Sequence, residues 1–170
     1  MPVAVNRSYV DAAPRDVFAA LSDARSYPYW AIGARGIRGV EGDWPSEGAR
    51  LHHSLGAFGV TVVRDSTVVL EHEPDALLVL EARLRPIGVA LVRLHLTPVE
   101  EGTLVTMEER MLQRPAGGER SGALGVLLRL RDRVVVVLLH LRNRWALHRL
   151  GRLARGQRVQ RRSGRGAPRP

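Results

Sequence analysis

The sequence predicts an α+β fold, in which a long C-terminal α-helix lies across a curved antiparallel β-sheet. Residues 50–112 alternate apolar and polar side chains with a period of two, which is typical of strands with one buried face. The turn-rich links at 72–75, 85–86 and 100–102 are too short for the crossovers that parallel strands need. The remaining chain continues with apolar residues at helical spacing.

The N-terminal part is expected to contribute one strand and two short helices. Residues 3–10 alternate as a strand, and Pro14 has the fixed backbone angle that suits a first helical turn. A first helix is predicted to end near Asp23 and a second to cover 24–32, interrupted by Pro28. One further strand is expected around 37–40.

Five strands are predicted at 50–58, 60–71, 77–84, 87–97 and 104–112. Their alternation assigns faces, because successive side chains of a strand point to opposite sides of the sheet. The expected inward set is Leu51, His53, Leu55, Leu78, Leu80, Ala82, Leu84, Ala90, Val92, Leu94, Leu96, Val105, Met107, Glu109 and Met111. This assignment places one histidine and one carboxylate on an otherwise apolar face.

A long helix is predicted over 122–153. At about 100° per residue, one apolar stripe is expected to cover the sheet. It consists of Leu127, Leu130, Val134, Val137, Leu138, Leu141 and Trp145. The opposite face is also partly apolar, with Leu128, Val135, Val136, Leu139, Leu147 and Leu150. That second face is expected either to lie under the short helices or to meet a partner, which would be a second copy in a homodimer or an anionic membrane surface.

Composition limits the classes of function. At 170 residues the chain suits one domain, expected over 1–155, and Cys is absent, which excludes disulfides and thiol chemistry. Neither a leader segment nor a membrane span is predicted, so a cytoplasmic location is expected. All 26 basic residues are Arg, and 16 of them lie in 110–170. The Arg-rich tail 156–170 is expected to be disordered. Residues 146–170 contain no aromatic residue for stacking on bases, which argues against sequence-specific nucleic-acid binding.

The N-terminal motifs resemble those of a known group. The segment 7–18, RSYVDAAPRDVF, with Leu21-Ser22-Asp23 and Tyr27-Pro28-Tyr29-Trp30, is similar to the opening of the START/Bet v 1-like (SRPBCC) superfamily. The closest resemblance is to its bacterial polyketide cyclase/dehydrase-like branch. The resemblance implies a helix-grip fold, with the sheet wrapped around the C-terminal helix and a ligand cavity between them. It implies ligand binding more strongly than catalysis.

The face assignment then predicts which residues surround a ligand. They are Tyr29, Trp30, His53, Leu80, Val92, Leu94, Met107, Glu109, Val134, Leu138, Leu141 and Trp145. His53 and Glu109 are the candidates for general acid–base catalysis, because burial moves the pKa values of both residue types toward neutrality. The alternative is that His53 is a core histidine and that Glu109 pairs with an arginine such as Arg129 or Arg133.

Other chemistry lacks support in the sequence. Adjacent strand residues such as His52 and His53 point to opposite faces and cannot share a metal ion, and no other histidine spacing suits one, so no metal is expected. Glycine-rich phosphate loops and nucleophile motifs are also missing, so no cofactor is expected.

Three functions remain open. The first is a carrier or sensor that binds a small hydrophobic or amphipathic ligand such as a lipid or polyketide. The second is a polyketide cyclase/dehydrase-type enzyme that uses the same cavity. The third is an interaction protein that acts through its basic C-terminal helix and tail.

Overall fold

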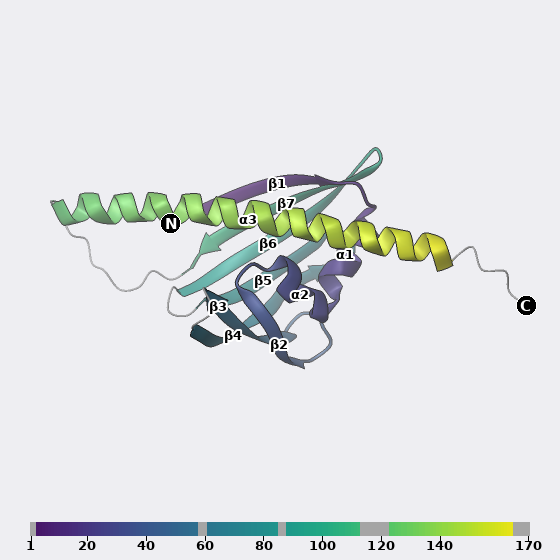
Figure 1. The fold of residues 1–170 in the computed structure, drawn as a ribbon, viewed down its shortest axis with the longest axis horizontal. Coiled ribbons are helices and arrows are strands. Elements are labelled where there is room, and N and C mark those ends of the chain that lie inside the picture. Colours follow the sequence, from purple (N-terminus) through teal and green to yellow (C-terminus); the bar gives the residue numbers. More distant parts are fainter. Residues whose placement is uncertain (1–2, 58–60, 85–87, 113–122, 165–170) are drawn as a thin grey trace, which may run out of the picture.

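The computed structural model describes residues 3–57, 61–84, 88–112 and 123–164. These residues form one antiparallel sheet, two short α-helices and a 3₁₀ turn after the first strand, and a long C-terminal helix (Figure 1). The elements in order are β1 (Val3–Val10), α1 (Pro14–Ser22), the 3₁₀ turn η1 (Ala24–Ser26), α2 (Tyr27–Trp30), β2 (Ala34–Glu41), β3 (Arg50–Ala57), β4 (Thr61–Glu73), β5 (Leu77–Leu84), β6 (Gly88–Val99), β7 (Gly102–Met111) and α3 (Ala123–Gly164). The predicted helix-grip fold is confirmed.

The sheet has seven strands in the order β1-β7-β6-β5-β4-β3-β2, and every neighbouring pair is antiparallel. Consecutive strands are joined in a meander from β2 to β7, and the N-terminal strand β1 adds to the far edge beside β7. The predicted strands 3–10 and 77–84 match β1 and β5, and the predicted start at residue 50 matches that of β3. The other described strand boundaries differ by one to three residues. Phe58, Val60 and Ile87, where three strands were expected to end or begin, lie outside the described residues.

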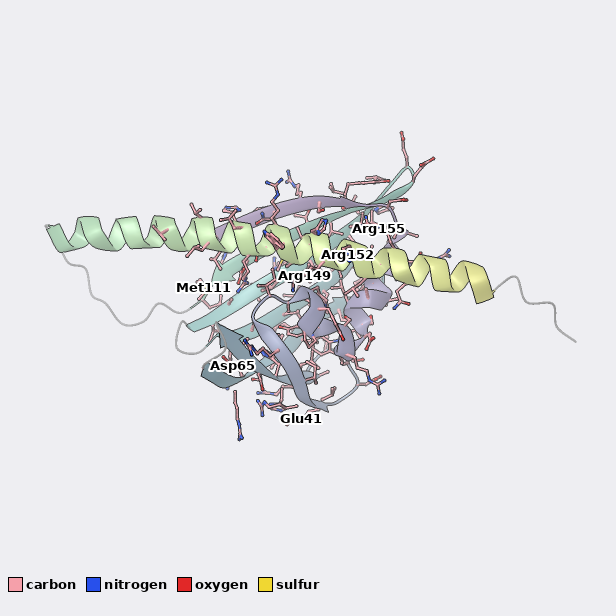
Figure 2. All side chains as sticks on the ribbon, viewed as in Figure 1. Glu41, Asp65, Met111, Arg149, Arg152 and Arg155 are labelled. Atoms are coloured by element: carbon pink, nitrogen blue, oxygen red, sulfur yellow. The ribbon has the colours of Figure 1, made fainter. Side chains whose placement is uncertain are left out.

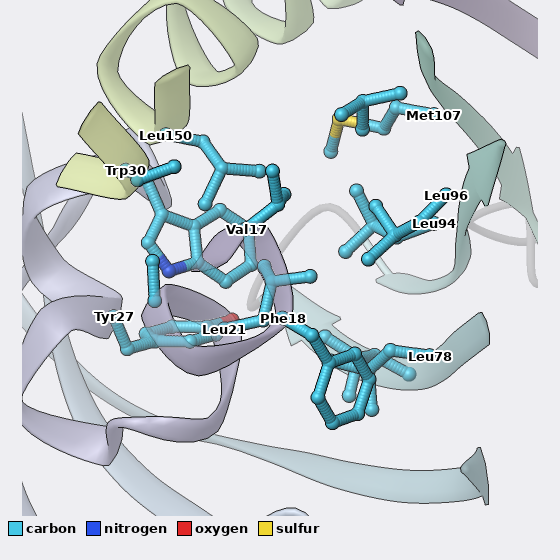
Figure 3. Close-up of a cluster of buried hydrophobic side chains, with 14 of the residues drawn as sticks. Val17, Phe18, Leu21, Tyr27, Trp30, Leu78, Leu94, Leu96, Met107 and Leu150 are labelled. Atoms are coloured by element: carbon cyan, nitrogen blue, oxygen red, sulfur yellow. The ribbon is translucent and has the colours of Figure 1, made fainter. Parts of the chain in front are cut away.

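The predicted inward face of the sheet is buried. Leu51, His53, Leu78, Leu80, Ala82, Ala90, Val92, Leu94, Leu96, Val105, Met107, Glu109 and Met111 are buried, and Leu55 is half-buried. The side chain of Leu84 lies outside the described ones. The short helices cover part of this face. Figure 3 shows Val17, Phe18 and Leu21 of α1 grouped with Tyr27, Trp30, Leu78, Leu94 and Leu150.

Helix α1 begins as its sequence predicts. Pro14 occupies its first turn, and Asp16 lies there too, where the helix dipole favours an acidic side chain. Its buried side is formed by Val17, Phe18 and Leu21. The turn η1 is capped by Asp23, whose side chain accepts a hydrogen bond from the backbone N–H of Arg25 at 2.9 Å. These local contacts place α2, and with it Tyr27 and Trp30, against the sheet.

The apolar stripe of α3 that was predicted to pack against the sheet is exposed instead, so this prediction is wrong. Val134, Val137, Leu138, Leu141 and Trp145 are between 52% and 62% exposed. The buried face is formed by Asn143, Ala146, Leu147, Leu150 and Ala154, each at most 3% exposed. Leu147 and Leu150, which were expected to face a partner, therefore belong to the core, while Val136 and Leu139 are half-buried. The side chains of Leu127, Leu128, Leu130 and Val135 lie outside the described ones.

Small residues explain why this face packs. Gly151 and Ala154 lie on the buried side of α3, and a Cβ atom added at Gly151 would come within 3.3 Å of Val10 Cγ2. The helix backbone can approach β1 closely only where its side chains are small. The prediction weighed apolar bulk alone, and bulk was greater on the other side.

Helix α3 also continues further than predicted. Residues 156–164 extend the helix to Gly164, so the expected disorder of the tail is wrong for this stretch, and residues 165–170 lie outside the described residues. In Figure 1 the helix runs across the sheet and projects beyond it at its N-terminal end. Among the described residues, no helix combines the length and apolar character needed to cross a membrane.

Candidate functional site

A cavity lies between the inward face of the sheet and the helices α2 and α3. It encloses about 50 Å³. The residues that line it are Tyr27, Trp30, Ala31, Ile32, Ala34, His53, Leu55, Leu80, Ala82, Val92, Met107, Glu109, Arg142, Asn143 and Ala146. Ala31, Ile32, Ala34 and Leu55 are half-buried, which marks the side on which the cavity opens to solvent.

Six of the twelve predicted ligand-contacting residues line this cavity: Trp30, His53, Leu80, Val92, Met107 and Glu109. Leu94 is fully buried in the core instead. Tyr29 is 66% exposed and lies outside the cavity, beside α3. Val134, Leu138, Leu141 and Trp145 are on the exposed face of α3, so their predicted place in the cavity is wrong.

The most buried charge in the cavity wall is Glu109 of β7. Its side chain is fully buried, and Arg142 Nη2 donates hydrogen bonds to both carboxylate oxygens, at 2.6 and 2.7 Å. The expected pairing of Glu109 with an arginine is present, but the partner is Arg142 and not Arg129 or Arg133. The missed signal is that Arg142 flanks the small-residue face of α3. This ion pair joins β7 to α3 across the cavity. Both oxygens of Glu109, which was a candidate for general acid–base catalysis, are therefore already hydrogen-bonded.

A chain of hydrogen bonds forms a second polar group. The Tyr27 hydroxyl lies 2.9 Å from Thr67 Oγ1, which lies 3.0 Å from His53 Nε2. Tyr27 and His53 also have their ring centroids 5.3 Å apart. Tyr27 was not among the predicted site residues; of the two aromatic residues predicted from the same segment, Trp30 lines the cavity and Tyr29 does not.

Burial sets the protonation of both rings. It lowers the pKa of His53, opposed by the nearby carboxylate of Asp65, so that the neutral imidazole is favoured. Burial also raises the pKa of the Tyr27 phenol, although its hydrogen bond with Thr67 acts in the opposite direction. The phenol therefore remains a hydrogen-bond donor at neutral pH.

Three buried nitrogen atoms of the cavity wall have no hydrogen-bond partner within the described part of the chain. They are Trp30 Nε1, His53 Nδ1 and Asn143 Nδ2. A buried polar group without a partner costs about 1–3 kcal/mol, so native proteins seldom keep several at one place. Arg142 adds further donors, since its described contacts use Nε and Nη2 but not Nη1.

The donor set does not suit a metal ion. Within the described ranges, no group of three or more His, Asp or Glu side chains is arranged to hold one. The unpartnered polar atoms described in the cavity wall are nitrogens, of which Trp30 Nε1 and Asn143 Nδ2 are N–H donors, and the one carboxylate in the wall is already paired with Arg142. The arrangement is suited to a ligand that offers oxygen acceptors from an otherwise apolar body.

Comparison with known proteins gives one family and several similar structures. Residues 2–133 match the family described as polyketide cyclase / dehydrase and lipid transport. No curated protein matches the sequence. A protein of unknown function from Staphylococcus aureus is similar with a TM-score of 0.73 at 10% identity, over 92% of this chain and 95% of its own.

Two similar structures come from biosynthetic systems. The di-domain ARO/CYC StfQ of the steffimycin biosynthetic pathway has a TM-score of 0.69 at 16% identity, over 93% of this chain and 52% of StfQ. DynU16, from the dynemicin biosynthetic locus, has a TM-score of 0.61 at 19% identity, over 89% of this chain and 46% of DynU16. This chain therefore spans about half the length of each. At these identities the likeness shows a shared fold.

Proposed function

The chain belongs to the polyketide cyclase/dehydrase and lipid transport family, and we propose that it binds one small amphipathic molecule between its sheet and α3. The family membership confirms the resemblance carried by the N-terminal motifs. The observation that carries the proposal is the group of unpartnered nitrogens of Trp30, His53 and Asn143 in an otherwise apolar cavity. A ligand with carbonyl, hydroxyl or ether oxygens would complete their hydrogen bonds.

Charge narrows the class of ligand. The positive charge of Arg142 is balanced by Glu109, so the cavity wall offers directed donors without a net charge from this pair. A fully charged ligand would have to leave water without a counter-charge, which is costly in a buried site. The proposed ligand is therefore uncharged or weakly polar, with its oxygens toward Trp30, Asn143 and Arg142.

The size of the cavity narrows the class of ligand further. Pockets for drug-sized molecules commonly enclose about 300–1,000 Å³, whereas this cavity encloses about 50 Å³. The enclosed space holds one functional group, and a larger apolar body extends through the open side past Ala31, Ile32 and Ala34 or widens the gap between α3 and the sheet. If α3 moves away from the sheet in this way, either the Glu109–Arg142 ion pair lengthens or the two side chains move together.

The test is mass spectrometry of the full-length protein, purified without detergent and extracted with organic solvent to identify what it retains. We expect one bound molecule per chain, with an apolar body and at least one oxygen acceptor. The matched variant is Asn143→Leu, which keeps the branched shape and the number of heavy atoms of the side chain but removes the unpartnered Nδ2. It should retain about fivefold less of the molecule, since the loss of one hydrogen bond is worth about 1 kcal/mol. Equal retention by both proteins, or a retained molecule without oxygen, would contradict the proposal.

A second candidate function, catalysis on such a ligand, is favoured by the hydrogen-bond chain from Tyr27 through Thr67 to His53. In a cyclisation, neutral His53 would take a proton from the carbon between two carbonyl groups. That carbon would then bond to a second carbonyl carbon, whose oxygen takes up a proton, and loss of one water would complete a dehydration. Glu109 is unsuited as the base because Arg142 holds both of its oxygens.

A linear poly-β-ketone thioester is the appropriate probe for this second function. We expect His53→Gln to abolish formation of the cyclised product while the thioester still binds, and Tyr27→Phe to slow it. If the wild-type protein binds the thioester and returns it unchanged, the enzyme function is excluded and the binding function stands.

A further inference from the structure

The exposed face of α3 carries an apolar stripe with no cover in the described structure. We define the stripe as Val134, Val137, Leu138, Leu141 and Trp145, which are 52–62% exposed. At about 100° per residue these five side chains lie on the side of the helix opposite the buried Asn143, Leu147 and Leu150. At about 1.5 Å per residue the stripe is roughly 16 Å long. Single exposed apolar residues are ordinary, but a contiguous row on one helix face marks an interaction surface.

Arginines continue the same face toward the C-terminus. Arg149 and Arg152 follow Trp145 at helical spacing and are exposed, as are Arg144 and Arg155 at its sides. Figure 2 shows Arg149, Arg152 and Arg155 along this part of α3. No acidic residue occurs in 133–170, so nothing on this segment of the sequence balances their charge.

A second helix contributes an aromatic side chain to this surface. Tyr29 of α2 is 66% exposed and lines an open hollow of about 430 Å³ together with Arg149, Arg152 and Leu153. Tyr29 and Trp145 thus flank Arg149 from two elements. Tyrosine and tryptophan beside arginine are the residue types enriched at the boundary between lipid headgroups and acyl chains.

We propose that this face binds the surface of an anionic phospholipid membrane. The apolar stripe enters the boundary of the acyl chains with the helix parallel to the surface, and Arg149 and Arg152 contact lipid phosphates at the hollow beside Tyr29. A second copy of the chain fits less well. The apolar spacing ends at Trp145, and pairing of two α3 helices in parallel would bring Arg149 and Arg152 against their own copies without an acidic partner.

Trp145 provides a direct probe. The protein has three tryptophans, and Trp30 and Trp44 are buried at 3% and 9% exposure while Trp145 is 62% exposed. Fluorescence of the full-length protein should shift to shorter wavelength when vesicles of phosphatidylcholine with about one third phosphatidylglycerol are added. Vesicles of phosphatidylcholine alone should give a much smaller shift, since each arginine contributes about 1 kcal/mol only where the surface is anionic.

Variants separate this site from the rest of the basic chain. Co-sedimentation with the anionic vesicles should weaken about 30-fold in Arg149→Ala/Arg152→Ala, which is about fivefold per arginine. It should weaken at least tenfold in Leu138→Ser/Leu141→Ser, and both variants should fold because all four residues are exposed. The matched control is Arg64→Ala/Arg83→Ala, two exposed arginines of the sheet, which should bind as the wild type does.

Three results would overturn the proposal. The first is that the wild-type protein ignores anionic vesicles. The second is that Leu138→Ser/Leu141→Ser binds them unchanged, which would assign binding to charge alone. The third is a dimer in solution that this same variant converts to a monomer, which would make the stripe a contact between copies.

Discussion

At the scale of single residues, the contact between Glu109 and Arg142 has the largest energetic consequence. Glu109 is fully buried and Arg142 is 28% exposed in its side chain, so the charge of Glu109 is compensated by Arg142 and shielded little by solvent. Removing one member of a buried ion pair leaves the other uncompensated, which costs about 3–5 kcal/mol in fully buried cases. The pair here is open on the side of Arg142, and its effect is expected at the lower end of that range.

We therefore expect Glu109→Gln to lower the free energy of unfolding by about 3 kcal/mol, measured by urea denaturation. The control is Glu41→Gln. Glu41 pairs with His52 at 2.6 Å and Arg50 at 3.8 Å, but its side chain is 67% exposed. Exposed pairs contribute about 1 kcal/mol or less. Similar losses in both variants would show that Glu109 and Arg142 are not held together in the cavity wall.

The lowered pKa of His53 predicts a dependence of stability on pH. The unfolded chain binds a proton at His53 below its ordinary pKa of 6.5, whereas burial makes the folded protein resist this proton. Stability contributed by His53 is thus complete above about pH 6.5 and is lost as the pH falls toward the lower pKa of the folded state.

Urea denaturation between pH 7.5 and 5 should show this loss in the wild-type protein and a flatter profile in His53→Gln. The exposed His95 serves as a control, and His95→Gln should keep the wild-type slope. An unchanged slope in His53→Gln would mean that the imidazole is solvated and not buried as described.

At the scale of elements, α3 has two apolar faces, and the structure assigns them opposite environments. Leu150 is fully buried between α3 and the core, while Leu138 is 59% exposed. Truncation of a buried leucine to alanine costs about 2–5 kcal/mol, whereas the same change on the surface has an effect within about 0.5 kcal/mol. The two leucines lie on one helix, so helix propensity affects both alike.

We expect Leu150→Ala to lower the free energy of unfolding by about 3 kcal/mol and Leu138→Ala to leave it nearly unchanged, both by urea denaturation of the full chain. If Leu138→Ala lowered the free energy of unfolding more than Leu150→Ala, the stripe predicted from the sequence would pack against the sheet after all. That result would also remove the surface proposed to bind membranes.

This helix shows where sequence patterns stop being informative. The alternation of β6 identified its buried residues because a strand has only two faces and the other face of β6 carries Arg93, His95 and Thr97. In β5 the alternation missed Val79, which is 2% exposed on the face opposite Leu78 and Leu80. In α3 both faces are apolar, and the choice was made by the close approach of Gly151 to Val10 of β1 and by the packing of α3 against α1. Such fit depends on the neighbouring elements and cannot be obtained from one helix alone.

The cavity could also be predicted only in part, because the sequence indicated the strand residues of its wall but not the contacts between them and the other elements. His53 and Glu109 were placed on the inner face by strand alternation, which is a local property of the chain. Thr67 of β4 joins His53 of β3, and Arg142 of α3 joins Glu109 of β7, through contacts between different elements. Asn143 enters the cavity wall beside Arg142, whose Nε donates to Asn143 Oδ1. No pattern within the sequence specifies those contacts.

At the scale of the whole molecule, the part that contains the sheet and the part that contains α3 differ in charge. The sheet half, residues 1–109, carries 10 Arg against 15 acidic residues, and the basic excess of the chain lies in residues 110–170. The cavity opens between these two parts, with the exposed face of α3 turned away from the sheet. Ligand binding and membrane binding would thus use different sides of the same helix.

Filling the cavity tests whether it is the ligand site. Ala146 lines the cavity and is 3% exposed, and Ala146→Met adds three heavy atoms to a space of about 50 Å³. Native mass spectrometry of the wild-type protein and this variant, purified side by side, measures the fraction of chains that hold a ligand. We predict a bound molecule in the wild type and its loss in a folded Ala146→Met protein. Equal occupancy in the two proteins would place the ligand elsewhere and contradict the account.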